Sequence, residues 1–186
     1  MNRGAAAFLV MLVSALPAAG PVVADFSDPA EVERWIGIHD RVMGGVSEAA
    51  LAHAGDHAVF SGTVSTDFGG GFASVRRAPA DMALGGHAGL SLRVRGDGKQ
   101  YQLRLKPGDR LDGTTWRALF VPGPEWETLS LSFDRFEPVF RGRPVPGAGA
   151  LDPSAVRQMG LMIAGGQEGP FRLEIRSVNP LSSTGP

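Results

Sequence analysis

Short runs of alternating apolar and polar residues, separated by glycine, proline and aspartate, are the feature that most restricts how this chain can fold. The chain contains 26 glycines and 14 prolines, and no long stretch keeps a helical apolar period. A period of two sends successive side chains to opposite faces of a strand, so that each run can bury one face. Many short runs of this kind predict an all-β sandwich or barrel.

Eight runs are predicted to be strands, and two short segments are predicted to be helical turns. The strands are residues 58–66, 72–77, 89–95, 100–106, 115–121, 127–133, 158–164 and 171–178. One helical turn is expected over residues 29–35, with Ser27 or Asp28 as its cap, and the other over residues 153–157 after Asp152.

The Asp97-Gly98 pair predicts a two-residue type I′ hairpin turn between two of these runs. Such a turn would pair Val94 with Tyr101 and Leu92 with Leu103. Apolar residues at alternate positions of both strands would then face one side. The runs 158–164 and 171–178 are predicted to form a second, terminal hairpin through the glycines at 165, 166 and 169, with 158–164 as a central strand buried on both faces.

The first 24 residues have the layout of a secretory signal peptide. Arg3 precedes an apolar segment over residues 5–16, and small residues stand before Asp25. Pro17 and Pro21 interrupt any helix long enough to span a bilayer. We therefore expect a leader over residues 1–24, one β-sandwich domain over 25–178, a loose tail over 179–186, and a periplasmic or secreted protein with no spanning segment after cleavage. The alternative is that the leader is not cleaved and serves as an anchor.

The composition argues against several classes of function. The chain has no cysteine and a formal net charge of −1, which excludes thiol chemistry and disulfides and gives no basic excess for nucleic acid. No nucleophile elbow or phosphate-binding loop is present. We interpret His53, Asp56 and His57 as a polar surface loop in preference to a metal site, and the acid pairs at 109 and 112 and at 125 and 127 as solvated. The sequence therefore predicts no catalytic residue, no metal and no cofactor.

Three loops combine charged groups with glycines, and loops held by a rigid sandwich are common binding sites. The candidate binding residues in these loops are Asp40, Arg41, Met43, Gly44, Gly45, Gly70, Gly71, Arg76 and Arg141. We expect a site at one end of the sandwich with Asp40, Arg41, Arg76 and Arg141 as its polar groups. The alternative is a structural ion pair between Asp40 and one of the arginines.

Five segments in order resemble the complex I intermediate-associated protein 30 family. They are DRVMGGVS (40–47), GGFASVR (70–76), LRVRGDGKQYQLRL (92–105), FEPVFRGR (136–143) and GPFRLEI (169–175). The resemblance covers about residues 26–178 and implies a galactose-binding-like jelly roll. It also implies a non-catalytic role, because the mitochondrial members assist the assembly of respiratory NADH:ubiquinone oxidoreductase.

Three functions are compatible with these observations. The first is an accessory protein that binds a protein partner and assists an envelope or respiratory complex. The second is a carbohydrate- or small-ligand-binding module, which would use exposed aromatic residues; Trp116 and Trp126 are candidates, whereas Tyr101 is expected to face inward. The third is a hydrolase, which would require His39, Asp40 and a distant carboxylate to meet in one pocket.

Overall fold

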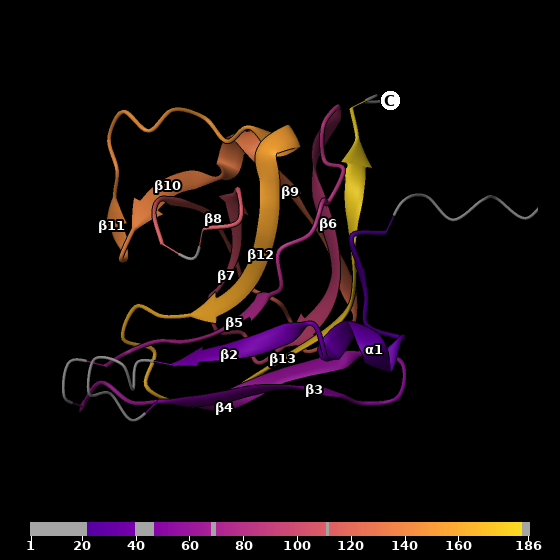
Figure 1. Cartoon of the computed structure of the whole chain (residues 1–186). Coiled ribbons are helices and arrows are strands. Elements are labelled where there is room, and N and C mark those ends of the chain that lie inside the picture. The colour runs from indigo at the N-terminus through magenta and orange to yellow at the C-terminus, as the bar shows by residue number, and fades with distance from the viewer. Residues whose placement is uncertain (1–21, 40–46, 68–69, 111, 184–186) are drawn as a thin grey trace, which may run out of the picture.

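Two antiparallel sheets lie face to face in the computed structural model, which describes residues 22–39, 47–67, 70–110 and 112–183 (Figure 1). Sheet A has the order β3 (Glu48–His53), β4 (Ala58–Val64), β13 (Gly169–Ser182), β6 (His87–Gly96) and β9 (Glu127–Ser132), and β1 (Ala24–Asp25) pairs with β13. Sheet B has the order β11 (Arg143–Pro144), β10 (Glu137–Phe140), β8 (Thr115–Phe120), β7 (Tyr101–Pro107), β12 (Val156–Ile163), β5 (Ala73–Arg77) and β2 (Trp35–His39). The predicted all-β jelly-roll sandwich is confirmed.

The core lies between the sheets and is built from alternate residues of each strand. Leu90, Leu92 and Val94 of β6 are fully buried, as are Leu103 and Leu105 of β7. Aromatic rings join the two layers: the Tyr101 ring of sheet B lies 6.4 Å from the rings of Phe60 and Phe171 in sheet A. The inward faces predicted from the period of two are therefore the ones that form the core.

All eight predicted strands are present, with boundaries shifted by a few residues. The predicted helical turns are the helix α1 (Pro29–Val32) and the 3-10 turn η4 (Pro153–Ala155). The Asp28 carboxylate caps α1 by accepting from the backbone N–H of Ala30, and Asp152 caps η4 in the same way from Ser154. Proline at the start of each turn fits, because proline has no N–H to satisfy there.

The predicted hairpin at Asp97-Gly98 was wrong, because β6 belongs to sheet A and β7 to sheet B. The segment crosses from one sheet to the other. The backbone N–H groups of Gly96 and Gly98 donate to the carbonyls of Gly123 and Pro122 instead of closing a ladder between the two strands. The Asp97 carboxylate holds the crossing in place by accepting from the Tyr101 hydroxyl at 3.0 Å and from the Arg172 backbone N–H at 2.8 Å.

The predicted terminal hairpin was also wrong, although 158–164 is a central strand. β12 lies between β7 and β5 in sheet B, and β13 lies between β4 and β6 in sheet A. The loop between them turns at Gly165 and Gly166, which have φ of +83° and +72°. The Gln167 side-chain amide holds this loop against the residue before β7, because its Nε2 donates to the Gln100 carbonyl at 2.7 Å.

Five strands had no counterpart in the prediction: β1, β2, β3, β10 and β11. β3 has an alanine-rich sequence that favours helix, and its pairing with β4 makes it a strand. Gly62 of β4 permits this pairing, because a Cβ at Gly62 would lie 1.9 Å from the Glu48 carbonyl oxygen.

Both ends of the domain differ from the expected boundaries. Val23 and Ala24 are buried, and the Val23 backbone N–H donates to the Val178 carbonyl, so the fold begins two residues inside the expected leader. At the other end, β13 continues to Ser182, and Asn179 and Pro180 pair with β6. The expected loose tail is therefore strand over its first four residues.

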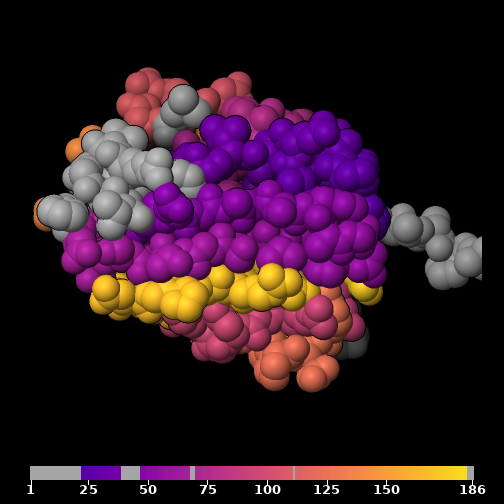
Figure 2. Space-filling view, turned by 90° about the horizontal axis from the view of Figure 1, so that it is seen from below, coloured from indigo at the N-terminus to yellow at the C-terminus, as the bar shows by residue number. Residues whose placement is uncertain are grey.

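Sheet A presents a continuous outer surface, on which β3, β4 and β13 appear as neighbouring bands in Figure 2. β2, at the edge of sheet B, lies beside β3.

Across the described ranges, no helix is long and apolar enough to cross a membrane.

Candidate functional site

The expected site residues are only partly within the described structure. Asp40, Arg41, Met43, Gly44 and Gly45 lie outside the described residues. The proposed catalytic meeting of His39, Asp40 and a carboxylate therefore stays untested.

Gly70 and Gly71 precede β5, and Gly71 has a φ of +126° that favours glycine. Their loop leads into β5 at Ala73, which pairs with His39 at the end of β2.

Arg76 and Arg141 do not form one cluster. Arg76 lies within β5, whereas Arg141 occupies the exposed turn between β10 and β11, with its guanidinium 5.3 Å from the centre of the Phe140 ring. Three strands separate β10 from β5, which places these two strands about 19 Å apart at the usual inter-strand spacing. Arg76 instead has other arginines as its neighbours.

The strand register places three arginines in one row across the outer face of sheet B. Arg117 of β8 stands opposite Arg104 of β7, Arg104 stands opposite Gly160 of β12, and Gly160 stands opposite Arg76 of β5. We call this row, which ends in Glu137 of β10 and Ile36 of β2, the arginine row.

Two further rows flank the arginine row on the same face. One contains neutral side chains, and its members in strand order are Ile38, Ser74, Met162, Gln102 and Leu119. The other contains Lys106 opposite Gln158. None of the strand residues in these three rows is aromatic.

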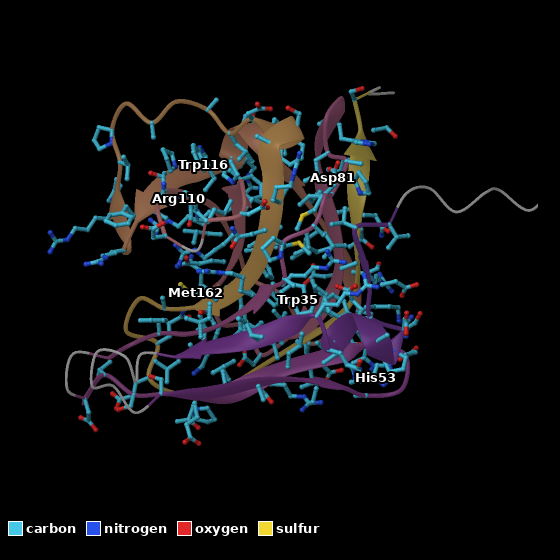
Figure 3. All side chains as sticks on the ribbon, viewed as in Figure 1. Trp35, His53, Asp81, Arg110, Trp116 and Met162 are labelled. Atoms are coloured by element: carbon cyan, nitrogen blue, oxygen red, sulfur yellow. The ribbon has the colours of Figure 1, made fainter. Side chains whose placement is uncertain are left out.

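The outer face of sheet B is hollowed. Sheet B bends, and Figure 3 shows Met162 on its concave outer side. A shallow groove, partly open to solvent, lies over β5, β12 and β7. The curvature explains why the outward-facing Gln102 and Gln158 are buried although they point away from the core. Gln158 Nε2 closes one end by donating to the carbonyls of Gly108 and Arg110 at 2.8 and 2.9 Å.

Burial and like charges act together on Arg104. Burial, together with the neighbouring charges of Arg76 and Arg117, lowers the pKa of Arg104 to about 10. Within the described part of the chain, the acceptor for the Arg104 guanidinium is the Met162 Sδ at 2.9 Å, which is a weak acceptor. Burial also lowers the pKa of Arg76.

Arg117 and Lys106 are further cations on this face, and each has an acidic neighbour, Glu137 for Arg117 and Asp112 for Lys106. Arg117 Nε is buried without a hydrogen-bond partner among the described residues, and its Nη2 lies 3.8 Å from the Glu137 carboxylate, whose side chain is 71% exposed. Lys106 Nζ donates to the Arg110 carbonyl at 2.6 Å. Burial lowers the pKa of Lys106, and the charge of Arg76 adds to this.

This arrangement costs folding energy, because like charges directly opposite one another on neighbouring strands destabilise a sheet. It also desolvates the Arg104 guanidinium and leaves Arg117 Nε without a hydrogen-bond partner among the described residues. A carboxylate or another anion placed above the row would relieve both costs. The arginine row is therefore our candidate site, and its chemistry is that of anion binding.

Sequence reasoning identified Arg76 and missed Arg104, Lys106 and Arg117. A signal was present: Gln102, Arg104 and Lys106 form the polar side of one strand, which is basic and contains no acid. This signal did not reveal the row, because residues 100–106 were predicted to pair with residues 89–95, whereas β7 pairs with β12 and β8.

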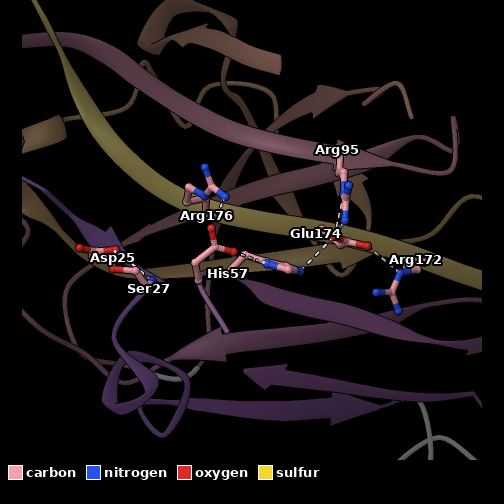
Figure 4. Close-up of polar contacts among 8 residues, drawn as sticks. Asp25, Ser27, His57, Arg95, Arg172, Glu174 and Arg176 are labelled. Atoms are coloured by element: carbon pink, nitrogen blue, oxygen red, sulfur yellow. Dashed lines mark hydrogen bonds and ion pairs between the residues drawn. The ribbon is translucent and has the colours of Figure 1, made fainter. Parts of the chain in front are cut away.

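A second polar cluster lies on sheet A, and its groups bind one another (Figure 4). The Glu174 carboxylate accepts from Arg95 Nε at 2.7 Å and from Arg172 Nε at 2.8 Å, and His57 Nε2 lies 3.0 Å away. Although burial alone would raise the pKa of Glu174, the bonds from Arg95 and Arg172 hold it below its usual value. Each arginine here bonds to a carboxylate, Arg95 and Arg172 to Glu174 and Arg176 to Asp56, so the cluster is less available to a charged ligand than the arginine row.

The predicted polar loop at His53, Asp56 and His57 is part of this cluster. His57 Nδ1 lies 2.9 Å from the Asp56 carboxylate, which also pairs with Arg176. Among the residues with described positions, no group of three or more histidine, aspartate or glutamate side chains could hold a metal ion.

The aromatic candidates for sugar stacking are all engaged in other contacts. Tyr101 is buried and faces inward as predicted, and burial beside Asp97 raises the pKa of its hydroxyl. Trp116 packs against the core and donates through Nε1 to the Gly149 carbonyl at 3.3 Å. The guanidinium carbons of Arg95 and Arg176 each lie 5.0 Å from the centre of the Trp126 ring.

Comparison with known sequences gives a family and one distant relative. The profile of the family described as complex I intermediate-associated protein 30 matches residues 24–175. An uncharacterized protein of Schizosaccharomyces pombe is 29% identical over 171 residues, which cover 80% of this chain and 78% of the yeast protein.

Comparison with solved structures gives the same fold in carbohydrate-binding modules. The family 11 module of the cellulase Lic26A-Cel5E of Clostridium thermocellum aligns with a TM-score of 0.68 at 17% identity, over 87% of this chain and 94% of the module. A family 11 module from the same organism, in complex with a β-1,3-1,4-mixed-linked tetrasaccharide, aligns with a TM-score of 0.61 at 19% identity, over 83% of this chain and 93% of the module. A crystal structure of an agarase matches at a TM-score of 0.57 and 15% identity, over 88% of this chain and 24% of the agarase.

Proposed function

Because this chain belongs to the complex I intermediate-associated protein 30 family, we propose that it is a non-catalytic accessory protein that binds a protein partner through the outer face of sheet B. The partner is a component of a respiratory or other envelope complex, whose assembly or stability the protein assists. The family supports the accessory role, and the buried charge of Arg104, which stands opposite Arg117 and donates to the weak acceptor Met162 Sδ, supports the choice of surface.

One observation carries this proposal: Arg104 stands directly opposite Arg117 in the sheet, and no carboxylate among the described residues bonds to Arg104. A folded chain gains nothing from this pair by itself. Retaining a destabilising arrangement is typical of a surface whose function is to bind something else.

The protein is proposed to be exported to the periplasm or secreted. The charged start, the apolar segment and the small residues before Asp25 support export. A cut before Val23 would keep the buried Val23 and Ala24 in the mature fold, whereas a cut after Ala24 would remove both.

Carbohydrate binding is the second candidate, and it is favoured by the shared fold with carbohydrate-binding modules. Fold alone does not determine a ligand. Neutral sugars are usually held on exposed aromatic faces, and the three rows on sheet B have none. We therefore rank a protein partner ahead of a carbohydrate ligand.

Site-specific photo-crosslinking in the native host tests the proposed surface. A photo-reactive benzoylphenylalanine in place of Leu119, which lies on the outer face of sheet B and is 38% exposed, is expected to give a discrete adduct in the periplasmic or envelope fraction. Mass spectrometry of the adduct should identify a subunit of an envelope complex.

The matched control carries the same group in place of Thr128, an exposed residue on the outer face of sheet A. This position is expected to give no discrete adduct. Equal adducts from both positions, or none from position 119, would rule out the outer face of sheet B as the partner surface.

A further inference from the structure

We infer that the arginine row binds carboxylate side chains of an acidic, extended segment of the partner protein, laid across the strands of sheet B. This inference rests on the proposed function and specifies the chemistry of its ligand. The occupant follows from charge complementarity, from the spacing of the row and from the side chains beside it.

The spacing of the row fits a short peptide. Arg117, Arg104 and Arg76 occupy strands β8, β7 and β5, with β12 between the last two. Three inter-strand steps place the outer two strands about 14 Å apart, which is the length of about four extended residues. A segment with carboxylates at alternate positions can therefore reach more than one of these guanidinium groups.

Gly160 leaves space in the middle of the row. It stands between Arg104 and Arg76 and carries no side chain above the sheet. A Cβ at this position would also lie 2.9 Å from the Val75 carbonyl oxygen, so a larger residue would disturb the pairing of β12 with β5. The gap lets a ligand backbone approach the sheet between the two arginines.

The guanidinium groups are suited to carboxylates. Arginine presents a planar set of donors that matches a carboxylate with two parallel hydrogen bonds. Arg104 and Arg76 are partly desolvated, as the direction of their pKa values shows, and a charge pair formed there is screened less than one in open water. Lys106 in the next row adds a further positive charge.

The neighbouring row favours a peptide over an acidic polysaccharide. Leu119 and Met162 lie beside the arginines on the same face, and Ile36 ends the arginine row with a side chain that is 60% exposed. These side chains offer apolar contacts to the aliphatic residues of an amphipathic segment. A uronate chain has no matching apolar side chains and would lack an aromatic platform.

Fluorescence anisotropy with a labelled hexaglutamate peptide tests the inference. The purified protein is expected to bind hexaglutamate and not hexaglutamine, and binding should weaken as salt is raised. Arg104→Met keeps the aliphatic stem but removes the charge, and it should weaken hexaglutamate binding about tenfold or more through loss of a charge-assisted contact. The matched control Arg93→Met, on the outer face of sheet A, should bind as the wild type does.

Each other outcome overturns the inference. If hexaglutamate fails to bind, or binds Arg104→Met as well as the wild type, the arginine row is not a carboxylate site. If oligogalacturonate binds and competes while hexaglutamate does not, the occupant is an acidic glycan. Suppose that the purified protein does not bind hexaglutamate, and that the crosslinked adduct from position 119 still forms when Arg104→Met is added. This inference would then be refuted, while the outer face of sheet B would remain the proposed partner surface. If the chain with the photo-reactive group at position 119 and no other change gives no adduct, the proposed function itself is refuted.

Discussion

Replacing Arg77 with leucine is expected to lower the free energy of unfolding by about 3–5 kcal/mol, because the change leaves the buried Glu31 carboxylate without its counter-ion. Both side chains are almost inaccessible, with residue exposures of 6% for Arg77 and 5% for Glu31. Arg77 Nε and Nη2 donate to the two Glu31 oxygens at 2.6 and 3.0 Å. Trp35 Nε1 donates to the same carboxylate at 3.0 Å, so the pair joins α1, β2 and β5.

Chemical denaturation of matched variants checks this prediction. Arg34 also contacts Glu31, at 3.4 Å, but its side chain is 58% exposed, so Arg34→Leu should cost about 1 kcal/mol or less. The double variant Glu31→Leu, Arg77→Leu should recover part of the loss, because it removes both charges. If Arg77→Leu costs no more than Arg34→Leu, the buried pair does not hold α1 to the sheet.

Leu103→Ala is expected to cost about 2–5 kcal/mol, the usual range for a leucine deleted from a packed core. Leu103 is fully buried between the sheets, opposite Ala118 and Leu161 in sheet B. Its removal would open a cavity directly beneath the groove.

The control for this prediction lies one strand away on the opposite face. Leu119 of β8 points outward and is 38% exposed, so Leu119→Ala should cost about 1 kcal/mol or less. Equilibrium unfolding of the two variants compares the two faces of sheet B. If both variants lose the same free energy of unfolding, the strand register that puts Leu103 inside and Leu119 outside is contradicted, because a slip of one residue exchanges the inner and outer faces of a strand.

The sequence predicts eight of the thirteen strands in the described structure and which of their side chains face inward, since both follow from the period of two. Leu92, Val94, Tyr101 and Leu103 are all fully buried, as the alternation indicates. The sequence does not predict which strands pair. Asp97-Gly98 is a reliable sign that the chain reverses, but it does not say whether the next strand stays in the same sheet. Here the Asp97 carboxylate bonds to Tyr101 and Arg172 and stabilises a crossing between sheets.

The candidate site was less predictable for the same reason. Arg76, Arg104 and Arg117 are distant in sequence, and each is unremarkable as an outward-facing polar residue. They form one row only through the pairing of β5, β12, β7 and β8, which depends on long-range register. The loop glycines drew attention to Arg76, whereas Arg141, chosen on the same grounds, lies at the far edge of the sheet.

The free energy of unfolding of Arg104→Met, measured without any ligand, distinguishes an arginine row kept for binding from one kept for folding. If the row is kept for binding, the variant should be as stable as the wild type or up to about 1 kcal/mol more stable, because it removes a like charge opposite Arg117 and keeps an apolar stem of similar length. A loss of about 2 kcal/mol or more would show instead that Arg104 stabilises the fold itself.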